Sequence, residues 1–420
     1  MKRLAIVGSG IAGLGAAWLL RNHFAITLYE QQAHLGGHTN TITIDENGRS
    51  VPIDTGFMVF NHVTYPNLTR LFSELNVATK PTDMSFSVQH QPSGLEYNGG
   101  SLGLLFAQRK NLLNLRHWKM LMAINRFNAE AVPAMEDARY AAMTLREYVE
   151  ARGYGDDMWE RYLVPMSSAV WSTPPELMAQ FPAVTLLRFW HNHGFLGLHT
   201  QHPWWTVCNG AKSYVAKIKT DLGENLKIRP RVTRIERTAA GATITAADGH
   251  TNVFPKVILA SHADQSLALL ADPTPLETRL LTPFKYQPNL ATLHTDQSIM
   301  PRTRRAWAAW NYRYDGAGRP STHYWMNRLQ GVSEHVQYFV SLNCREEIDP
   351  SKVLRHIEYE HPLFDLPALA AQRRLGELNQ LSPDQSTYYA GAWFKYGFHE
   401  DGFTSGLHCA RAIAGESLWS

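Results

Sequence analysis

The chain has few cysteines. It holds 3 in 420 residues, Cys208, Cys344 and Cys409, which lie far apart and lack the spacing of a metal site. An odd number of widely separated thiols excludes a disulfide framework and favours buried free cysteines in a reducing compartment. We therefore expect a cytoplasmic protein.

Long hydrophobic runs and a strong charge of either sign are also missing. No uninterrupted apolar stretch approaches the roughly 18 residues that a membrane-spanning helix needs. Lys2 and Arg3 lead directly into an apolar segment, so we expect no signal peptide. The formal net charge of +3 predicts no nucleic-acid partner. The protein is expected to be soluble, or peripheral at the inner face of the membrane.

The N-terminal segment carries the clearest signal. Apolar residues 4–7 predict a strand that runs into Gly8-Ser9-Gly10-Ile11-Ala12-Gly13, a Gly-x-Gly-x-x-Gly pattern. Gly8 permits a tight turn, Gly10 lets the backbone approach a pyrophosphate, and Gly13 lets the next helix pack closely on the sheet. The first amides of that helix, at Ile11 and Ala12, would face the phosphates. The pattern predicts a dinucleotide site.

An acidic residue stands where such a site needs one. Glu30 ends a second predicted strand over residues 25–29, about 20 residues beyond the glycines, where a carboxylate can accept hydrogen bonds from ribose hydroxyls. A carboxylate there would repel a 2′-phosphate, which argues against NADP. Gln31 is expected to lie at the same site.

The rest of the chain alternates between strand and helix patterns. We predict a hairpin over 39–44 and 50–53, helices over 68–75, 102–148, 211–218 and 405–414, and strands over 226–228, 232–235, 242–245 and 257–261. The last of these strands is fully apolar, which is typical of the interior of a parallel sheet. Aromatic-rich alternation from 286 to about 340 favours a second, mostly antiparallel sheet.

The order of these pieces resembles the superfamily of FAD-dependent amine oxidases, protoporphyrinogen oxidases and phytoene desaturases. Its Gly-Gly doublet is matched by Gly36-Gly37, its Asp-x-Gly by Asp54-Thr55-Gly56, and its strand near the adenine by Val232 to Ile235. Its closing Ala-Gly and Ser-Gly segments are matched by Ala390-Gly391 and Ser405-Gly406. The resemblance implies an α/β fold, with a Rossmann-type FAD-binding domain and a second substrate domain of helices and an antiparallel sheet.

The same resemblance implies domain boundaries and a set of cofactor contacts. The FAD-binding domain would take residues 1–75, 205–265 and 380–420, and the substrate domain 76–204 and 266–379. The residues expected to bind FAD are Gly8, Gly10, Ile11, Ala12, Gly13, Glu30, Gln31, Gly36, Gly37, His38, Asp54, Thr55, Gly56, Val232, Ala260, Gly391, Gly402, Phe403 and Ser405. His38 stands where amine oxidases usually have arginine, and Asn289 lies near the position of their active-site lysine.

Several stretches look like a narrower subgroup, the predicted NAD/FAD-binding proteins that in bacteria often accompany cyclopropane-fatty-acyl-phospholipid synthase-like methyltransferases. These stretches are Gly36-Gly37-His38-Thr39, Val170-Trp171-Ser172-Thr173, Asn192-His193-Gly194, Thr292 to Asp296, Met300-Pro301-Arg302 and Tyr396 to Gly402. The resemblance implies dehydrogenation or desaturation of an apolar acyl or lipid-like substrate, and a lipid methyltransferase as a partner. Amine oxidation and an accessory role with structural FAD are the alternatives.

The segment from 393 to 402 is expected to run beside the flavin, because it precedes the last predicted helix. We predict Lys395, His399 and Glu400 as the residues that affect proton transfer or redox potential there. A flavin performs its own hydride chemistry, so no dedicated nucleophile is required. Alternatively, these polar groups cap the last helix or hold the loop.

Two further clusters are open to more than one interpretation. The histidines at 191, 193, 199 and 202 lack a helical His-x-x-x-His pair with an adjacent carboxylate, so we predict no metal site. Between 104 and 126, basic residues interleave with leucine, tryptophan and methionine. That pattern is compatible with docking on anionic lipid, with a substrate-entrance helix pair, or with helices buried on one side.

Overall fold

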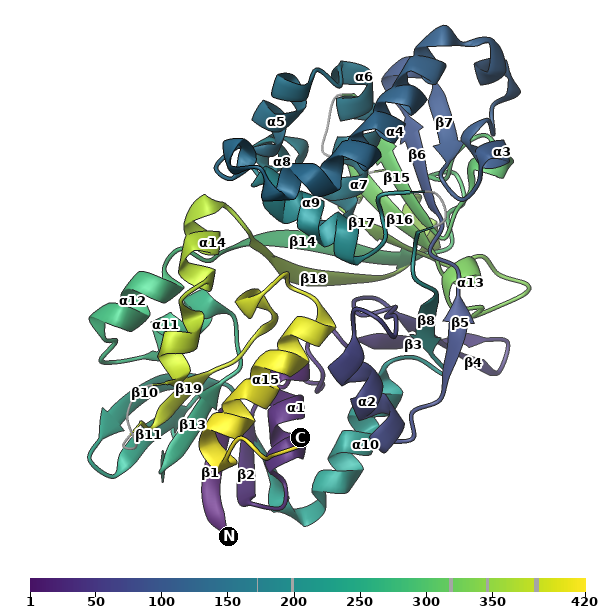
Figure 1. Ribbon diagram of the computed structural model, residues 1–420. Helices are drawn as coiled ribbons and strands as arrows, with labels where there is room; N and C mark the ends of the chain where they lie inside the picture. Colours follow the sequence, from purple (N-terminus) through teal and green to yellow (C-terminus); the bar gives the residue numbers. More distant parts are fainter. Residues whose placement is uncertain (172, 198–199, 317–319, 345–346, 381–384) are drawn as a thin grey trace.

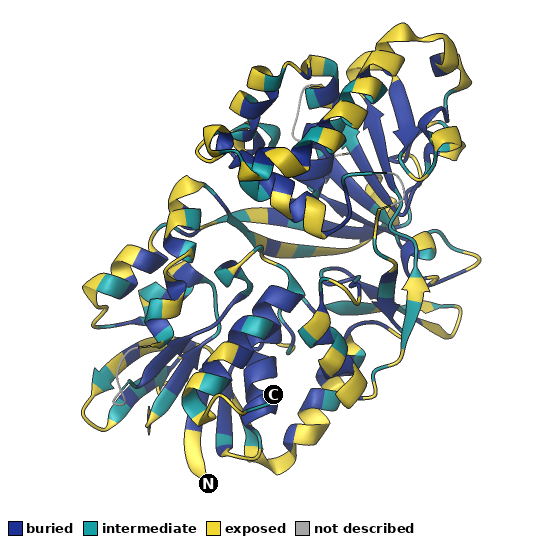
Figure 2. Cartoon of the chain, viewed as in Figure 1, coloured by how far each residue is buried: buried dark blue, intermediate teal, exposed yellow. Residues whose placement is uncertain are grey.

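The computed structural model describes residues 1–171, 173–197, 200–316, 320–344, 347–380 and 385–420. Ser172 and His199, which the sequence analysis singled out, lie outside these ranges. Two sheets organise the chain, one in the lower and one in the upper half of Figure 1, and the long strands β14 and β18 of the upper sheet lie nearest the lower half. Figure 2 shows both sheets largely buried under helices with exposed outer faces.

The lower half is built on a parallel sheet. Its strands, in spatial order, are β19 (Thr387–Tyr389), β13 (Lys256–Leu259), β1 (Lys2–Val7), β2 (Phe24–Tyr29) and β9 (Leu226–Arg229). β1 and β13 are central and almost continuously apolar, as strands buried on both faces must be. This confirms the predicted Rossmann-type half and the place of the strand near 257.

Three helices and a small sheet cover this parallel sheet. α1 (Ile11–Leu20) packs against both α10 (Lys212–Leu222) and α15 (His399–Ala414). The three-stranded sheet of β10 (Val232–Thr238), β11 (Gly241–Ala246) and β12 (Thr251–Phe254) contacts β1 and β13. The carboxyl ends of β1, β2 and β13 therefore meet at one edge, where ligands bind in open α/β sheets.

The upper half holds a seven-stranded sheet. Its spatial order is β18 (Val353–Leu363), β14 (Lys285–His294), β17 (Phe339–Leu342), β16 (Ser321–Trp325), β15 (Trp310–Tyr314), β6 (Phe86–His90) and β7 (Leu95–Asn98). The pairs are antiparallel except β15 with β6, which is parallel. This confirms the mostly antiparallel second sheet.

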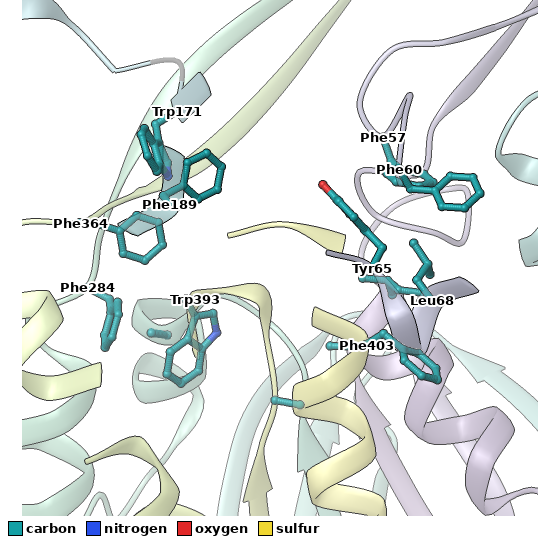
Figure 3. Packing of buried hydrophobic residues seen from close by; sticks show 14 of the residues in the cluster. Phe57, Phe60, Tyr65, Leu68, Trp171, Phe189, Phe284, Phe364, Trp393 and Phe403 are labelled. Carbon is teal, nitrogen blue, oxygen red and sulfur yellow. The ribbon is translucent and has the colours of Figure 1, made fainter. Parts of the chain in front are cut away.

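The helices of the upper half come mainly from the region where a helical pattern was predicted. They are α3 (Leu102–Leu105), α4 (Leu115–Glu136), α5 (Leu145–Arg152), α6 (Asp156–Met158), α7 (Val164–Trp171), α8 (Pro175–Ala179), α9 (Ala183–Asn192) and α13 (Met326–Leu329). α7 packs on β15, and α9 packs on α4 and α5. One apolar cluster continues from these helices into the parallel sheet, and Figure 3 shows part of it.

Short elements join the two halves. The hairpin of β3 (Thr41–Glu46) and β4 (Arg49–Asp54) is the predicted one. β5 (Thr79–Thr82) pairs with β8 (Trp204–Val207), and α2 (Pro66–Glu74) packs on α15. α11 (Ala263–Leu269), α12 (Pro275–Leu281) and α14 (Leu366–Gln372) lie beside the lower half in Figure 1. The residue boundaries of the two domains stay a prediction.

One element differs from the sequence prediction. The last helix was predicted to begin at residue 405, but α15 begins at His399. Glycine has a low helix propensity, yet Gly402 lies inside α15. A Cβ at this position would sit 2.7 Å from Cγ2 of Ile11. The carboxylate of Asp401 accepts hydrogen bonds from the amides of Tyr396 and Phe398, which stabilises the start of α15 at His399. Among the described residues, no helix is long and apolar enough to cross a membrane.

Candidate cofactor site

The turn from β1 into α1 forms a cradle of backbone. Gly8 has φ +101°, and a Cβ there would lie 2.7 Å from the carbonyl oxygen of Ala260, just beyond β13. A Cβ on Gly13 would lie 2.0 Å from the carbonyl oxygen of Gly8, so helix and strand approach too closely for any side chain. At Gly10 a Cβ would meet nothing within 4 Å. The space before the first turn of α1 is therefore open to a ligand.

An acidic side chain is fixed beside this cradle. Glu30 follows β2, and its carboxylate accepts hydrogen bonds from the amides of Ser9 at 2.9 Å, Gln31 at 2.7 Å and Gln32 at 2.8 Å. The hydroxyl of Ser9 donates to it as well. Backbone donors of this kind hold the carboxylate in one orientation.

A second glycine loop lies on the first. The amide of Gly36 donates to the carbonyl of Ser9 at 3.0 Å, and a Cβ on Gly37 would lie 3.1 Å from Cα of Gly10. Both glycines have positive φ, at +121° and +58°. The doublet therefore brings the next residue, His38, to the edge of the cradle.

His38 is one of four histidines that gather here from separate segments. The others are His262 after β13, His361 in β18 and His399 at the start of α15. The rings of His38 and His361 have centroids 5.3 Å apart, and His38 also stacks on Tyr359 at 4.8 Å. Nε2 of His38 is buried and has no hydrogen-bond partner among the described residues. Such an atom is what a bound polar group would satisfy.

Burial keeps this histidine cluster neutral. It lowers the pKa of His38 to about 4, with a further contribution from His262. Burial and the charge of a neighbouring histidine likewise lower the pKa of His262 to about 4 and that of His361 to about 3. The pKa of His399 is lowered well below its usual value by burial and by His38. All four rings are uncharged at neutral pH.

Sequence reasoning named two members of this cluster and missed two. His262 lies three residues beyond β13. Ligands bind at the carboxyl ends of central parallel strands, so this position could have predicted His262 as a site residue. His361 stands in a long strand of the other sheet and carried no local signal.

The three predicted catalytic residues lie in different surroundings. His399 stacks on Phe57 with centroids 3.8 Å apart, and its Nε2 lies 2.9 Å from Oγ1 of Thr39 and 3.4 Å from the hydroxyl of Tyr214. Lys395 is exposed, with Nζ 5.7 Å from the centre of the Tyr396 ring. The structure therefore brings His399, and not Lys395, to the glycine loops.

Glu400 has a structural role. Its carboxylate accepts hydrogen bonds from the amides of Asn67 at 3.1 Å and Leu68 at 2.9 Å, in the first turn of α2. It therefore caps α2, whereas the capping alternative from sequence had placed these polar groups on the last helix. Burial raises the pKa of this carboxyl group.

The predicted Asp54 is buried and linked to three segments. It accepts hydrogen bonds from the amide of Ala211 at 2.9 Å, from Nε2 of Gln330 at 2.6 Å, and from the hydroxyl of Thr41. Burial raises its pKa to about 6, although these donors oppose the rise. Asp54 therefore ties the hairpin to α10 and to the upper half.

The two residues after Asp54 support the histidine cluster. The hydroxyl of Thr55 lies 2.8 Å from that of Tyr359, on which His38 stacks. A Cβ on Gly56 would lie 2.2 Å from the carbonyl oxygen of His38. This tight contact explains the glycine.

The remaining predicted residues mostly hold α15 against α1. The amide of Gly391 donates to Oγ of Ser405 at 2.8 Å. Gly402 packs on Ile11, and the ring of Phe403 fills the space that a Cβ on Gly15 would need. Val232 is buried at the start of β10, and Ala12 is buried in the first turn of α1.

Comparison with known proteins assigns the family. The profile described as "Flavin containing amine oxidoreductase" matches residues 11–414. The chain belongs to this family. The flavin-containing amine oxidoreductases use FAD, so this protein is an FAD-dependent oxidoreductase, and the open cradle at Gly10, the fixed Glu30 and the unsatisfied Nε2 of His38 suit that cofactor.

Several solved structures share the whole fold. Putrescine oxidase bound to putrescine superposes with a TM-score of 0.68 at 13% identity, over 98% of each chain. Cyclohexylamine oxidase from Brevibacterium oxydans IH-35A gives 0.68 at 14% identity, over 99% of each. A CLA-producing fatty acid isomerase from P. acnes gives 0.65 at 15% identity, over 96% of this chain and 97% of that one. At these identities the likeness establishes the fold alone.

One curated relative is similar in sequence over a short segment. Carotenoid phi-ring synthase from Chlorobaculum tepidum is 32% identical over 79 residues, which is 19% of this chain. The match spans 12% of that protein's length.

Proposed function

We propose that this flavoprotein dehydrogenates or desaturates an apolar acyl or lipid-like substrate. The observation that carries the proposal is the aromatic surrounding of the residues just before α15. Phe189 of α9 stacks on Phe398 with centroids 5.3 Å apart, and it contacts Tyr396 at 5.4 Å and Trp171 at 4.7 Å. Figure 3 shows Trp171 and Phe189 together. Tyr396 and Phe398 are half-buried, so a ligand that reaches them meets aromatic side chains, which favour apolar groups.

The charged groups near these aromatics support the same proposal. The carboxylates of Glu400 and Asp401 are occupied by backbone amides of α2 and of the turn before α15. The neighbouring histidines are neutral. An ammonium substrate would thus meet aromatic rings and uncharged imidazoles but no carboxylate from Glu400 or Asp401. Because aromatic faces also attract cations, amine oxidation is the alternative that the reduction test below separates from lipid dehydrogenation.

The names of two relatives are consistent with an apolar substrate. One is a fatty acid isomerase and one a carotenoid synthase, whereas two others are oxidases of amines. This supports an apolar substrate only weakly, since the first likeness is of fold and the second covers a short segment.

We propose these roles for residues of the chain. The cradle at Gly8, Gly10 and Gly13 holds the pyrophosphate of FAD, and Glu30 accepts hydrogen bonds from the ribose. FAD held there would supply the acceptor for the hydride that the substrate loses. The accompanying proton passes to solvent, since burial makes His399 a weak base. The uncharged His399 ring, held by Thr39 and Phe57, affects the redox potential of the flavin. Lys395 and Glu400 have no part in this proposal.

The test is anaerobic reduction of the purified holoprotein. Adding phospholipid with monounsaturated acyl chains should bleach the flavin absorption, and mass spectrometry should show acyl chains that lack two hydrogen atoms. Bleaching by simple aliphatic amines, and not by lipid, would overturn the proposal in favour of amine oxidation. If neither reduces the flavin, the proposal also fails, and an accessory role beside a lipid methyltransferase becomes the better account.

A further inference from the structure

An open pocket of about 450 Å³ lies in the upper half of the molecule and shares no residue with the cofactor site. It lies between the segments before and within α3, the loop that precedes β15, and the junction of β16 with α13. Its lining residues are Asp83, Ser85, Asn98, Gly100, Leu104, Arg304, Arg305, Trp307, Trp325 and Arg328.

Three arginines make this pocket strongly basic. Arg328 forms an ion pair with Asp83, the acidic residue of the lining. Arg304 and Arg305 are exposed, and no carboxylate of the described residues pairs with either one. The pocket therefore keeps two guanidinium groups that a ligand can neutralise. Guanidinium groups match the oxygens of phosphate in charge and in geometry.

Tryptophans hold one of these groups in place. The guanidinium carbon of Arg304 lies 3.5 Å from the centre of the Trp307 ring and 5.3 Å from that of Trp325. The two indoles meet edge to face at 5.3 Å. Because stacking already orders Arg304, binding an anion there loses less side-chain entropy.

Large apolar side chains are exposed in α3, which lines the pocket with Leu104, and in the segment that follows it. Leu113 is 91% exposed and Leu115 is 77% exposed. Leu102, Trp118 and Met122 are exposed as well. In Figure 2 the region around α3 and the start of α4 shows much exposed surface. A helix merely buried on one side would turn such residues inward, as it does His117 and Met120.

Packing contacts join this apolar crest, formed by Leu102, Leu113, Leu115, Trp118 and Met122, to the helix that lines the pocket. α3 carries Leu104, which lines the pocket, and the backbone oxygen of its neighbour Leu105 lies 3.1 Å from Nε2 of His117 in α4. Phe106 contacts Trp118 with centroids 4.9 Å apart. Arg109, Lys110 and Lys119 are exposed on the same segment.

We propose that this face docks on an anionic phospholipid membrane, with a lipid phosphate in the arginine pocket and the leucine crest in the headgroup layer. Exposed leucine and tryptophan suit the interface, and the surrounding lysines and arginines match its negative charge. A protein or nucleic-acid partner would not require the combination of an apolar crest and a basic pocket. The proposal does not depend on the proposed function.

Flotation of the FAD-loaded protein with vesicles tests this proposal. We expect binding to vesicles of phosphatidylglycerol and phosphatidylcholine in equal parts, and little binding to phosphatidylcholine alone. The double variant R304Q/R305Q should bind the anionic vesicles roughly 30-fold more weakly, since each basic residue contributes about 1 kcal/mol at such a surface. The variant L113S/L115S should also lose binding, because it removes two apolar side chains that would enter the headgroup layer. Both side chains are exposed, so their replacement leaves the core intact.

The control is K227Q/R231Q, which removes two exposed charges from the β9 edge of the parallel sheet. It should bind like the wild type, and thermal unfolding and flavin absorption should be unchanged in all variants. Equal binding to both kinds of vesicle, no binding to either, or wild-type binding by R304Q/R305Q would each overturn the proposal. Stabilisation by inorganic phosphate without vesicle binding would overturn it as well, since the pocket would then serve a free anion.

Discussion

Replacing Gly406 by alanine tests the helix contact on which the cofactor site rests. Gly406 lies in α15, where a Cβ would sit 2.4 Å from the backbone oxygen of Ala12 in α1 and 3.4 Å from the amide nitrogen of Ala16. Real Cβ atoms essentially never approach closer than 3.0 Å, and neither backbone atom can rotate away. The two helices must therefore move apart.

The expected cost follows from this geometry. Overpacking of a well-packed contact costs about 1 to 3 kcal/mol. Alanine recovers up to about 1 kcal/mol through its higher helix propensity. With that gain of about 1 kcal/mol subtracted, we expect G406A to lower the free energy of unfolding by up to about 2 kcal/mol.

The displacement should also reach the cofactor. α1 begins at the cradle and α15 begins at His399, so their separation changes both ends of the site at once. We expect weaker FAD binding together with lower stability. Urea unfolding of the holoprotein and titration of the apoprotein with FAD measure the two effects.

The matched control is G103A in the short helix α3. A Cβ there would meet only Oγ of Ser101, at 4.0 Å. We expect this variant to be as stable as the wild type or slightly more stable, with unchanged FAD affinity. Should G406A behave like G103A in both assays, the close packing of α1 on α15 would be refuted.

Three further outcomes are expected. H399A should change the redox potential of the flavin and slow its anaerobic reduction, and T39V, which removes one hydrogen-bond partner of the ring, should have a much smaller effect on both. Equal potentials and equal rates in stopped-flow traces would contradict the proposed role of His399. E400A should lower the free energy of unfolding in urea by about 1 to 2 kcal/mol, because two amides of α2 lose their acceptor. Its flavin reduction rate should stay near that of the wild type. A slower rate without a loss of stability would argue against the capping role. Asp54 has a folded pKa of about 6 against 3.8 unfolded, so the stability that its protonated form contributes is complete below 3.8 and is lost as the pH rises through 6, by about 3 kcal/mol. The stability of D54N should fall less over that range, and parallel pH profiles of the two proteins would show that Asp54 does not titrate as described.

Much of the half that holds the cofactor site could be predicted from local sequence patterns. The turn at Gly8, the close packing at Gly13 and the acid at Glu30 belong to one short segment whose steric needs are local. The apolar strand at 257–261 likewise indicated burial on both faces. Each inference needed only neighbours along the chain.

The start of α15 shows where such reasoning fails. Gly402 weakens a helix by intrinsic propensity, so a helix start after it was a reasonable prediction. In the folded protein the lost propensity is outweighed by packing, because only glycine fits against Ile11. That contact joins residues almost 400 positions apart. Glu400 is similar, since its capping partners lie in α2.

The sequence by itself determined the dinucleotide site, because glycine loops and their acid are dictated by short-range sterics and hydrogen bonding, and its resemblance to a known superfamily added FAD and oxidoreductase chemistry. Tertiary structure decided which polar residues share a site. It gathered four histidines from separate segments and lowered their pKa values by burial, and it gave Glu400 to a neighbouring helix. It also joined Asp83, Arg304 and Arg328 in one pocket. Burial and proximity depend on contacts between residues that are distant in the chain, and local sequence patterns do not predict such contacts.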